Sequence, residues 1–133
     1  MASLVLVVAG IARQEDRILL TQRPTGSHLA GQWEFPGGKI REGEDPEQAL
    51  QREWLEELGV GCSDIRAYGF AYHAYPEKTV LILFYEIRLT GRPIPQENQA
   101  MEWIHIQRLN EYPMPAADVS IVQRLITEHS ENV

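Results

Sequence analysis

Residues 38–60, GKIREGEDPEQALQREWLEELGV, constrain this chain more than any other segment. Asp45 can accept the free N–H groups of a first helical turn, and the proline after it suits the first helical position. Gln48 completes a capping-box pattern, and Gly59 suits a left-handed helix end. These signals predict a helix over residues 46–58.

One face of the predicted helix is acidic. At 100° per residue, Glu53, Glu56 and Glu57 fall within one sector of about 100°, and the large apolar residues fall in the adjacent sector. A solvated acidic face is the alternative to a site. However, like charges four residues apart destabilise a helix, and the last turn favours cations. Oxygen clusters suit Mg²⁺ or Mn²⁺, which bridge to phosphates, so the glutamates are predicted to be metal ligands.

The same segment resembles the Nudix box of the Nudix hydrolases. Gly38 is followed after five residues by Glu44, and after seven more by the run REWLEELGV, which begins at Arg52. Trp54 stands where the box usually has an aliphatic residue. Because Trp54 falls in the apolar sector, this departure affects local packing more than chemistry.

The remaining pattern predicts a mixed β-sheet and a second helix. Strands are expected at residues 4–12, 17–23, 33–35, 66–73, 79–89 and 101–104, and a helix is expected within 116–129. Turn-rich segments, among them 24–32 and 91–99, are expected to be loops. Two helices and a mixed sheet imply an α/β fold of the α/β/α sandwich type. The resemblance implies the same architecture, the Nudix fold.

Length and composition restrict the class of protein. The chain has 133 residues and a net charge of −7. The length fits one domain, residues 1–133. The negative charge argues against a nucleic-acid polymer as partner, whereas metal ions can offset the repulsion of a small phosphorylated ligand. No apolar segment approaches the roughly 20 residues of a membrane span. Cys62 is the one cysteine, so we expect no internal disulfide and a cytoplasmic location. A monomer or weak dimer is also expected.

Outside the box, the chain resembles the MutT type of Nudix enzyme. These enzymes are pyrophosphohydrolases of nucleoside triphosphates that clear oxidised nucleotides such as 8-oxo-dGTP. The matching segments are TQRP around Arg23, Glu34-Phe35-Pro36, Tyr75-Pro76, Glu97 with Glu102-Trp103, and PAAD ending at Asp118. The resemblance implies metal-assisted attack of water on phosphorus, which gives a nucleoside monophosphate and pyrophosphate.

The resemblance also implies roles around the metals. The expected ligands are Glu53, Glu56, Glu57, a backbone carbonyl of the paired glycines at Gly37, and Glu97 from a later loop. Either Glu53 or Glu97 is a candidate general base. Gly38 allows close approach of the backbone. Glu44 is expected either to have a structural role, to support the metal ligands from outside, or to bind the metal directly. Arg52 is expected to orient a box carboxylate rather than touch substrate.

Weaker signals concern the rest of the substrate. Phe35 and Tyr75 offer aromatic faces for a base, although Phe35 is equally a candidate for plain core. Arg23 and Lys78 offer contacts to sugar or phosphate, although Lys78 also suits a solvated turn. The histidines lack metal-ligand spacing and are interpreted as structural or surface groups. They are His28, His73, His105 and His129.

Asp118 bears on the choice of base. The MutT-type enzymes that prefer 8-oxo-dGTP most sharply have an asparagine here, whose amide can donate to O6 and accept from N7–H. An ionised aspartate only accepts, which suits an exocyclic amine such as that of cytosine. The segment EYPMPAAD resembles CTP pyrophosphohydrolases, so hydrolysis of CTP, dCTP or methylated dCTP is an alternative, while other relatives with aspartates here accept oxidised purines. A non-catalytic nucleotide-binding module is a further alternative, but such modules are expected to lack box carboxylates, and none is missing.

Overall fold

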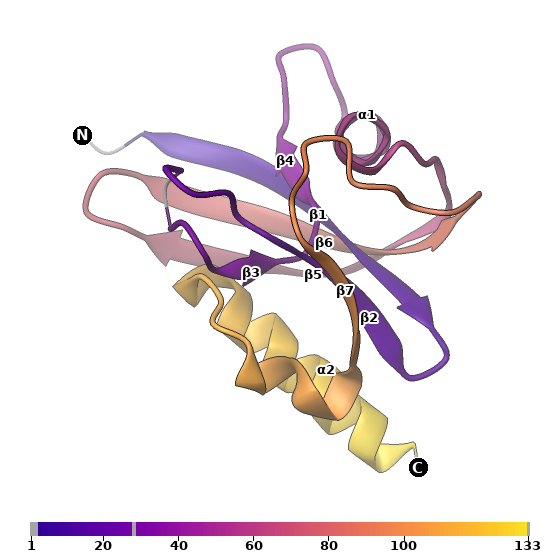
Figure 1. Ribbon diagram of the computed structural model, residues 1–133. Helices are drawn as coiled ribbons and strands as arrows, with labels where there is room; N and C mark the ends of the chain where they lie inside the picture. The colour runs from indigo at the N-terminus through magenta and orange to yellow at the C-terminus, as the bar shows by residue number, and fades with distance from the viewer. Residues whose placement is uncertain (1–2, 28, 133) are drawn as a thin grey trace.

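The computed structural model describes residues 3–27 and 29–132. Within them, a mixed sheet of seven strands lies between two α-helices (Figure 1), which confirms the α/β/α prediction. The strands are β1 (Leu4–Gln14), β2 (Arg17–Gln22), β3 (Trp33–Glu34), β4 (Gly37–Lys39), β5 (Cys62–Ala74), β6 (Thr79–Leu89) and β7 (Met101–His105). The helices are α1 (Pro46–Leu58) and α2 (Val119–Glu131), with 3-10 helices η1 (Ile106–Glu111) and η2 (Ala116–Asp118). No helix in the described part of the chain is long and apolar enough to cross a membrane.

Strand β1 organises the sheet. It runs parallel to β6 over nine residue pairs, and its last two residues pair with the start of β2 in a tight hairpin. Its other edge pairs with β4, where Val8 lies opposite Gly38 and Ala9 opposite Gly37. Since β4 precedes α1 in the chain, this pairing places the two glycines beside the acidic helix.

The two faces of the sheet carry separate hydrophobic cores. Successive strand residues point to opposite faces, so Val8 of β1 joins the α1 core while Ala9 joins the α2 core. The α1 core contains Leu50, Trp54 and Leu58 from the helix itself. The α2 core is the larger, and it includes residues of η1, η2 and α2 as well as five strands. The helices are thus fixed on opposite sides of one sheet.

Helix α1 has the predicted bounds. Asp45 Oδ1 accepts a hydrogen bond from the Gln48 N–H at 2.9 Å, and Gln48 Oε1 accepts one from the Asp45 N–H at 2.9 Å. At the other end, Gly59 adopts a left-handed conformation, with φ of 62°. Both caps are local interactions, which is why the sequence alone could specify them.

Trp54 is fully buried, as its position in the apolar sector predicted. Its indole N–H donates a 3.0 Å hydrogen bond to the Pro36 carbonyl. Gly10 makes room for the ring, because a Cβ atom at that position would lie 2.5 Å from Trp54 Nε1. The unusual tryptophan therefore has a paired small residue, and it ties α1 to the segment that leads into β4.

Several element bounds differ from the predictions. Residues 37–39 form β4 and residues 106–111 form η1, and neither element was predicted. The helix expected within residues 116–129 is divided, since η2 occupies 116–118 and α2 begins at Val119. Strand β5 starts four residues earlier than predicted, at Cys62. Pairing partners far along the chain decide these bounds, and local sequence signals carry little of that information.

Candidate active site

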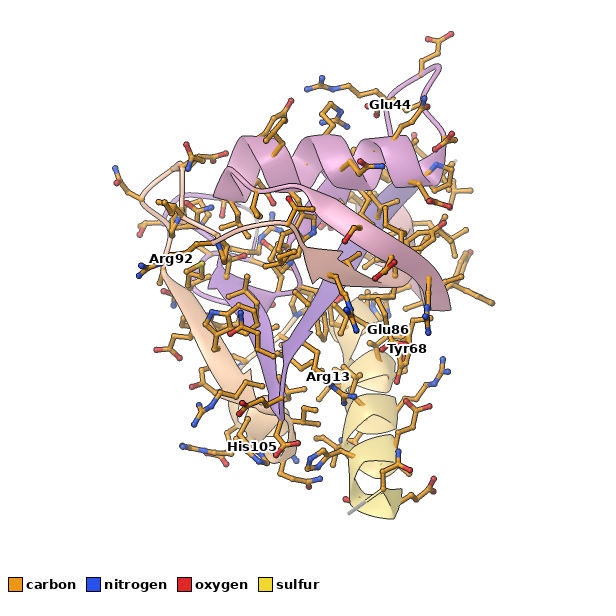
Figure 2. All side chains as sticks on the ribbon, turned by 90° about the vertical axis from the view of Figure 1, so that its right-hand side faces the viewer. Arg13, Glu44, Tyr68, Glu86, Arg92 and His105 are labelled. Carbon is orange, nitrogen blue, oxygen red and sulfur yellow. The ribbon has the colours of Figure 1, made fainter. Side chains whose placement is uncertain are left out.

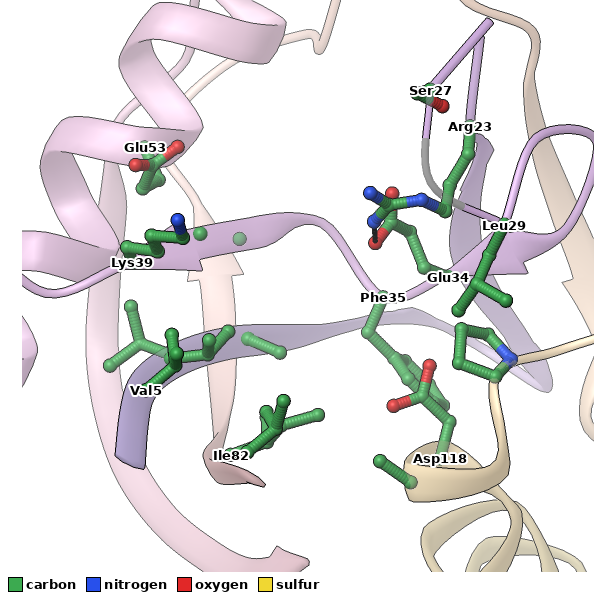
Figure 3. Close-up of a pocket in the computed structure, with 18 of the residues that line it drawn as sticks. Val5, Arg23, Ser27, Leu29, Glu34, Phe35, Lys39, Glu53, Ile82 and Asp118 are labelled. Carbon is green, nitrogen blue, oxygen red and sulfur yellow. Dashed lines mark hydrogen bonds and ion pairs between the residues drawn. The ribbon is translucent and has the colours of Figure 1, made fainter. Parts of the chain in front are cut away.

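A cavity of about 390 Å³ opens between α1, the N-terminal part of β1 and η2. Nine of the predicted site residues line it: Arg23, Phe35, Gly37, Gly38, Glu53, Glu57, Tyr75, Lys78 and Asp118. Figure 3 shows Glu53 above Lys39 at one end of the cavity and Asp118 at the other, with Phe35 nearer Asp118. One continuous cavity therefore joins the acidic helix to the residues expected to contact a base.

Arg52 organises the carboxylates of the box. Its guanidinium donates to Glu44 at 2.6 and 2.9 Å, to Glu53 at 2.8 Å and to Glu56 at 3.3 Å, and also to the Lys39 carbonyl at 2.9 Å. The hydrogen bonds that Glu44 accepts from Arg52 and from the Arg41 N–H lower the pKa of Glu44 to about 2. Both oxygens of Glu44 are engaged in this way. Arg52 thus links the loop before α1 to its acidic face.

Glu53 lies directly against the backbone of Gly38. A Cβ atom at residue 38 would lie 2.4 Å from the Glu53 carboxyl carbon, so any larger residue would displace that carboxylate. The Glu53 side chain is 15% exposed, and its hydrogen bond from Arg52 fixes its orientation. The glycine predicted to permit close approach is therefore approached by a carboxylate of α1.

Glu57 lies in the same cavity, one turn after Glu53. Burial and the negative charges of Glu53, Glu34 and Glu97 raise the pKa of Glu57 to about 8, while a hydrogen bond from the Gly37 N–H opposes the rise. Like charges gathered in a partly desolvated site favour binding of a cation. The charge arrangement therefore has a surplus of negative charge that a divalent ion would offset.

Glu97 approaches from the loop after β6. The Ile94 N–H donates to the Leu58 carbonyl at 2.8 Å, and the Gln96 N–H donates to the Glu57 carbonyl at 2.9 Å. The loop thereby satisfies the free carbonyls at the end of α1. Glu97 is exposed and does not line the cavity, but its charge acts on Glu57.

The far end of the cavity contains a buried acid and an ion pair. Asp118 is 4% exposed, and burial together with the negative charge of Glu34 raises its pKa to about 7, whereas Arg23 lowers it. Arg23 Nη1 donates to Glu34 Oε1 at 2.9 Å. Burial also raises the pKa of Glu34, against the effect of Arg23. This end can therefore present both donors and acceptors to a ligand.

The aromatic candidates differ in their surroundings. Phe35 is 3% exposed and packs edge-to-face on Phe84 at 5.7 Å, so it belongs to the core and also lines the cavity. Tyr75 lies at the cavity wall, where its hydroxyl accepts a 3.4 Å hydrogen bond from the Ala117 N–H. That bond connects the β5–β6 turn to the residue before Asp118.

Two charged residues of the cavity were missed from the sequence. Glu34 and Lys39 line the cavity beside Arg23 and Glu53 respectively (Figure 3). Glu34 adjoins Phe35 and Lys39 adjoins Gly38 in the sequence, and this position beside a predicted site residue was the available signal. Of the remaining predicted residues, Glu44, Arg52, Glu56 and Glu97 do not line the cavity.

Two of the histidines lie together in the fold, although they are far apart in the sequence. His105 and His129 meet Asp16 at 4.8 Å or less between potential ligand atoms, at a place remote from this cavity. His73 packs on Tyr75 with ring centroids 4.4 Å apart. His28 lies outside the described residues.

The box residues have the chemistry of a site for a hard divalent cation. All candidate side-chain ligands are carboxylates, and the raised pKa of Glu57 reflects burial and uncompensated like charges. The Gly37 and Gly38 backbone lies within reach of the same carboxylates. The donor set therefore fits Mg²⁺ or Mn²⁺ better than a softer ion.

Comparisons with known proteins agree with this geometry. A curated 8-oxo-dGTP diphosphatase of Haemophilus influenzae is 38% identical over 127 residues, which cover 94% of this chain and 93% of the relative. A CTP pyrophosphohydrolase of Escherichia coli is 34% identical, with coverage of 88% and 87%. The solution structure of the E. coli ORF135 protein superposes with a TM-score of 0.85 at 29% identity, and covers 98% of this chain and 94% of its own.

The family comparison covers nearly the whole sequence. The model of the NUDIX domain matches residues 3–125, a range that includes both the acidic helix and Asp118. The match therefore extends over the cavity as well as the box. This chain belongs to the NUDIX domain family.

Proposed function

We propose that this protein is a Mg²⁺-dependent nucleoside triphosphate pyrophosphohydrolase of the MutT type, acting on oxidised substrates such as 8-oxo-dGTP. The products would be the nucleoside monophosphate and pyrophosphate. The observation that carries the proposal is the single cavity that joins the box carboxylates to Asp118. A nucleotide can lie along it with its phosphates at α1 and its base at Asp118. The curated relatives named 8-oxo-dGTP diphosphatase support the same substrate class.

The box supplies the candidate metal ligands. We assign this role to Glu53, Glu56, Glu57 and Glu97, with the carbonyl of Gly37. A divalent cation held there supplies positive charge that offsets the phosphate oxygens and lowers the pKa of a coordinated water.

The other roles follow from hydrogen bonding. Glu44 is better suited to orienting Arg52 than to direct ligation, because both its oxygens already accept hydrogen bonds. Arg52 in turn holds Glu53 in place. Either Glu53 or Glu97 can accept the proton of the attacking water, since both carboxylates belong to this acidic cluster. Lys39 and Lys78 supply positive charge at the cavity wall for phosphate oxygens.

Asp118 also favours a second substrate, CTP or dCTP. In its ionised form the carboxylate accepts only, and an exocyclic amine such as that of cytosine donates. The CTP pyrophosphohydrolase relative is consistent with this alternative. The two substrates differ in which protonation state of Asp118 they need.

The test is a panel of nucleoside triphosphates and diphosphate derivatives incubated with the protein and Mg²⁺, with pyrophosphate and phosphate release as readouts. The proposal expects pyrophosphate from 8-oxo-dGTP, and kcat/KM values would rank it against CTP and dCTP. Binding without turnover of any compound would identify a non-catalytic nucleotide-binding module instead. Glu57→Gln serves as the matched inactive variant.

A further inference from the structure

Three polar side chains from distant parts of the chain meet at the other end of the molecule. Asp16 lies in the β1–β2 turn, His105 ends β7 and His129 lies in the last turn of α2. Figure 2 shows His105 at the end of the molecule opposite Glu44. One ring nitrogen of each histidine and one Asp16 oxygen lie within 4.8 Å of one another. Within residues 3–27 and 29–132, no other group of three His, Cys, Asp or Glu side chains does so.

The distance between His129 and Asp16 is close to that between two ligands of one metal ion. His129 Nε2 lies 3.2 Å from Asp16 Oδ1. Two ligands bound to Zn²⁺ at about 2.1 Å in tetrahedral geometry are separated by roughly 3.4 Å. The imidazole rings are perpendicular, with centroids 5.5 Å apart, so they can direct nitrogens to a common point without stacking.

The backbone around the cluster is fixed. The Ile106 N–H donates to the Asp16 carbonyl at 2.8 Å, which ties the β1–β2 turn to the residue after His105. Gln107 contacts both rings: its N–H donates to His105 Nδ1 at 3.1 Å, and its side-chain nitrogen lies 2.8 Å from His129 Nδ1. Gln107 thus engages Nδ1 on each ring, and because Nδ1 of His105 accepts a hydrogen bond, the proton of the neutral His105 ring is on Nε2. In metal sites the other ring nitrogen of a histidine ligand carries a proton and donates it to an acceptor, so both contacts have to change before an ion binds Nε2.

Binding through Nε2 requires the ring proton to be on Nδ1. At His129, half a turn of the Gln107 amide places an oxygen acceptor against that proton. This rotation of the amide breaks only the 3.4 Å hydrogen bond from Gln107 to the Ile126 carbonyl. The Ser130 hydroxyl accepts a 3.0 Å hydrogen bond from the Gln107 amide in the structure, and after the rotation it can donate one to the amide oxygen. At His105, the ring has to rotate away from the Gln107 N–H. Both changes are rotations of side chains, and the second takes away the present acceptor of the Gln107 N–H.

The donor set selects a different ion from that of the box. Two imidazoles and a carboxylate suit Zn²⁺, whereas Mg²⁺ prefers oxygen ligands alone. The His129 side chain is 12% exposed and that of Asp16 is 65% exposed, so a fourth position faces solvent. Water can fill that position.

We propose that Asp16, His105 and His129 form a second metal site, for Zn²⁺, that joins the last turn of α2 to the β1–β2 turn and the end of β7. Asp118, immediately before α2, lies at the helix end away from His129, so the ion fixes the helix that follows the base-reading residue. The site is structural and takes no part in hydrolysis.

The direct test is a Zn²⁺ titration of the metal-free protein, followed by the ring nitrogen resonances of its histidines in long-range proton–nitrogen spectra. We expect the ring nitrogens of His105 and His129 to shift with one equivalent of Zn²⁺, while those of His73 do not. The melting temperature should rise by about 5 °C at saturating Zn²⁺. Unchanged resonances of both histidines would overturn the proposal.

A pair of variants separates this site from Zn²⁺ bound by the box. Asp16→Asn removes a ligand, and Glu15→Gln makes the same change of charge at the neighbouring exposed residue. Because even outer-shell partners contribute about 10- to 100-fold to metal affinity, Asp16→Asn should weaken this site at least tenfold, and Glu15→Gln should not. Glu57→Gln should retain the histidine shifts. Equal Zn²⁺ binding by the Asp16 and Glu15 variants would contradict the assignment.

Discussion

Asp118 can change its hydrogen-bonding character within the physiological pH range. Its pKa is raised to about 7, chiefly by burial and then by the charge of Glu34. Below that pH the carboxyl group carries a proton, and it then offers one donor and one acceptor, as asparagine does. Above that pH it only accepts. The expectation of an acceptor-only aspartate therefore applies to the ionised form, and the protonated form suits 8-oxo-guanine.

Asp118→Asn tests this behaviour through substrate selectivity. In the wild type, the ratio of kcat/KM for 8-oxo-dGTP to that for dCTP should fall as pH rises from 6 to 8, because the donor is lost. The asparagine variant keeps its donor and should show a flat ratio. At pH 8 the variant should favour 8-oxo-dGTP by about 5- to 150-fold more than the wild type, since a buried hydrogen bond is worth roughly 1–3 kcal/mol. Competition assays at each pH measure the ratio, and equal profiles would show that Asp118 does not read the base.

Glu57 is expected to matter for turnover and to be dispensable for folding. Glu57→Gln replaces a carboxyl group whose pKa is raised by burial and by neighbouring carboxylates. The metal-free variant should therefore melt at the same temperature as the wild type or slightly higher. Turnover should fall at least about 100-fold, because a metal ligand accounts for several kcal/mol of transition-state stabilisation. Glu42→Gln, at an exposed loop position, is the control. A large loss of stability in the Glu57 variant would mean that this residue holds the fold.

At the scale of elements, α1 was predictable because its signals are local. Its capping box, its terminal glycine and its apolar sector all lie within about 15 residues, and the structure has each of them. Arg52 adds to this a link between the helix and the preceding loop through Glu44. Since α1 carries the candidate ligands, its ends set their position.

The N-terminal cap of α1 offers a test at this scale. Asp45→Ala removes the acceptor for the Gln48 N–H and should lower the free energy of unfolding by about 0.5–2 kcal/mol. Asp45→Asn retains a side-chain acceptor and should remain within a few tenths of a kcal/mol of the wild type, as asparagine caps about as well. Urea denaturation measures both. Equal losses in the two variants would show that charge near the helix start, rather than the capping bond, is what stabilises α1.

Elements and residues that depend on distant partners were not predictable. Strand β4 has a glycine-rich sequence typical of a turn, and its strand character comes from pairing with β1. Glu34 reaches the cavity because β3 pairs with β2, and its place beside Phe35 was the one signal in the sequence. His105 and His129 are 24 positions apart and meet an aspartate from the N-terminal hairpin. Spacing rules describe ligands on one motif, so they missed a cluster assembled by the fold.

At the scale of the molecule, the cavity lies where the two halves of the structure meet. The acidic end is built on α1 and β4, and the end proposed to bind the base is built on β3 and η2, while β1 lies in the sheet between the two cores. Each end gathers buried or partly buried acids, and Glu34 acts electrostatically on both Glu57 and Asp118. The charges at the two ends of the cavity are therefore coupled. Because the pKa values of Glu57 and Asp118 are raised in the folded protein, its stability should depend on pH.

The sign of that dependence follows from Asp118. Its pKa is about 7 in the folded protein and near 3.8 in the unfolded chain, so between these values the folded state holds a proton that the unfolded state has released. Stability should therefore fall as pH rises from about 4 to 7, by at most about 1.4 kcal/mol per unit, and then level off. Glu57 contributes in the same direction, because its pKa is raised as well.

Comparison with Asp118→Asn isolates the contribution of Asp118, because that of Glu57 is common to both proteins. Urea unfolding of the metal-free wild type and variant at pH 5, 6, 7 and 8 gives the difference in their free energies of unfolding. The wild type should lose stability relative to the variant between pH 5 and 7, and the difference should be constant above pH 8, where Asp118 is ionised in both states. A difference that does not change with pH would mean that Asp118 titrates near its ordinary pKa. In that case burial would not hold a proton on Asp118, and the donor needed to read 8-oxo-guanine would have to come from Arg23 or Lys78.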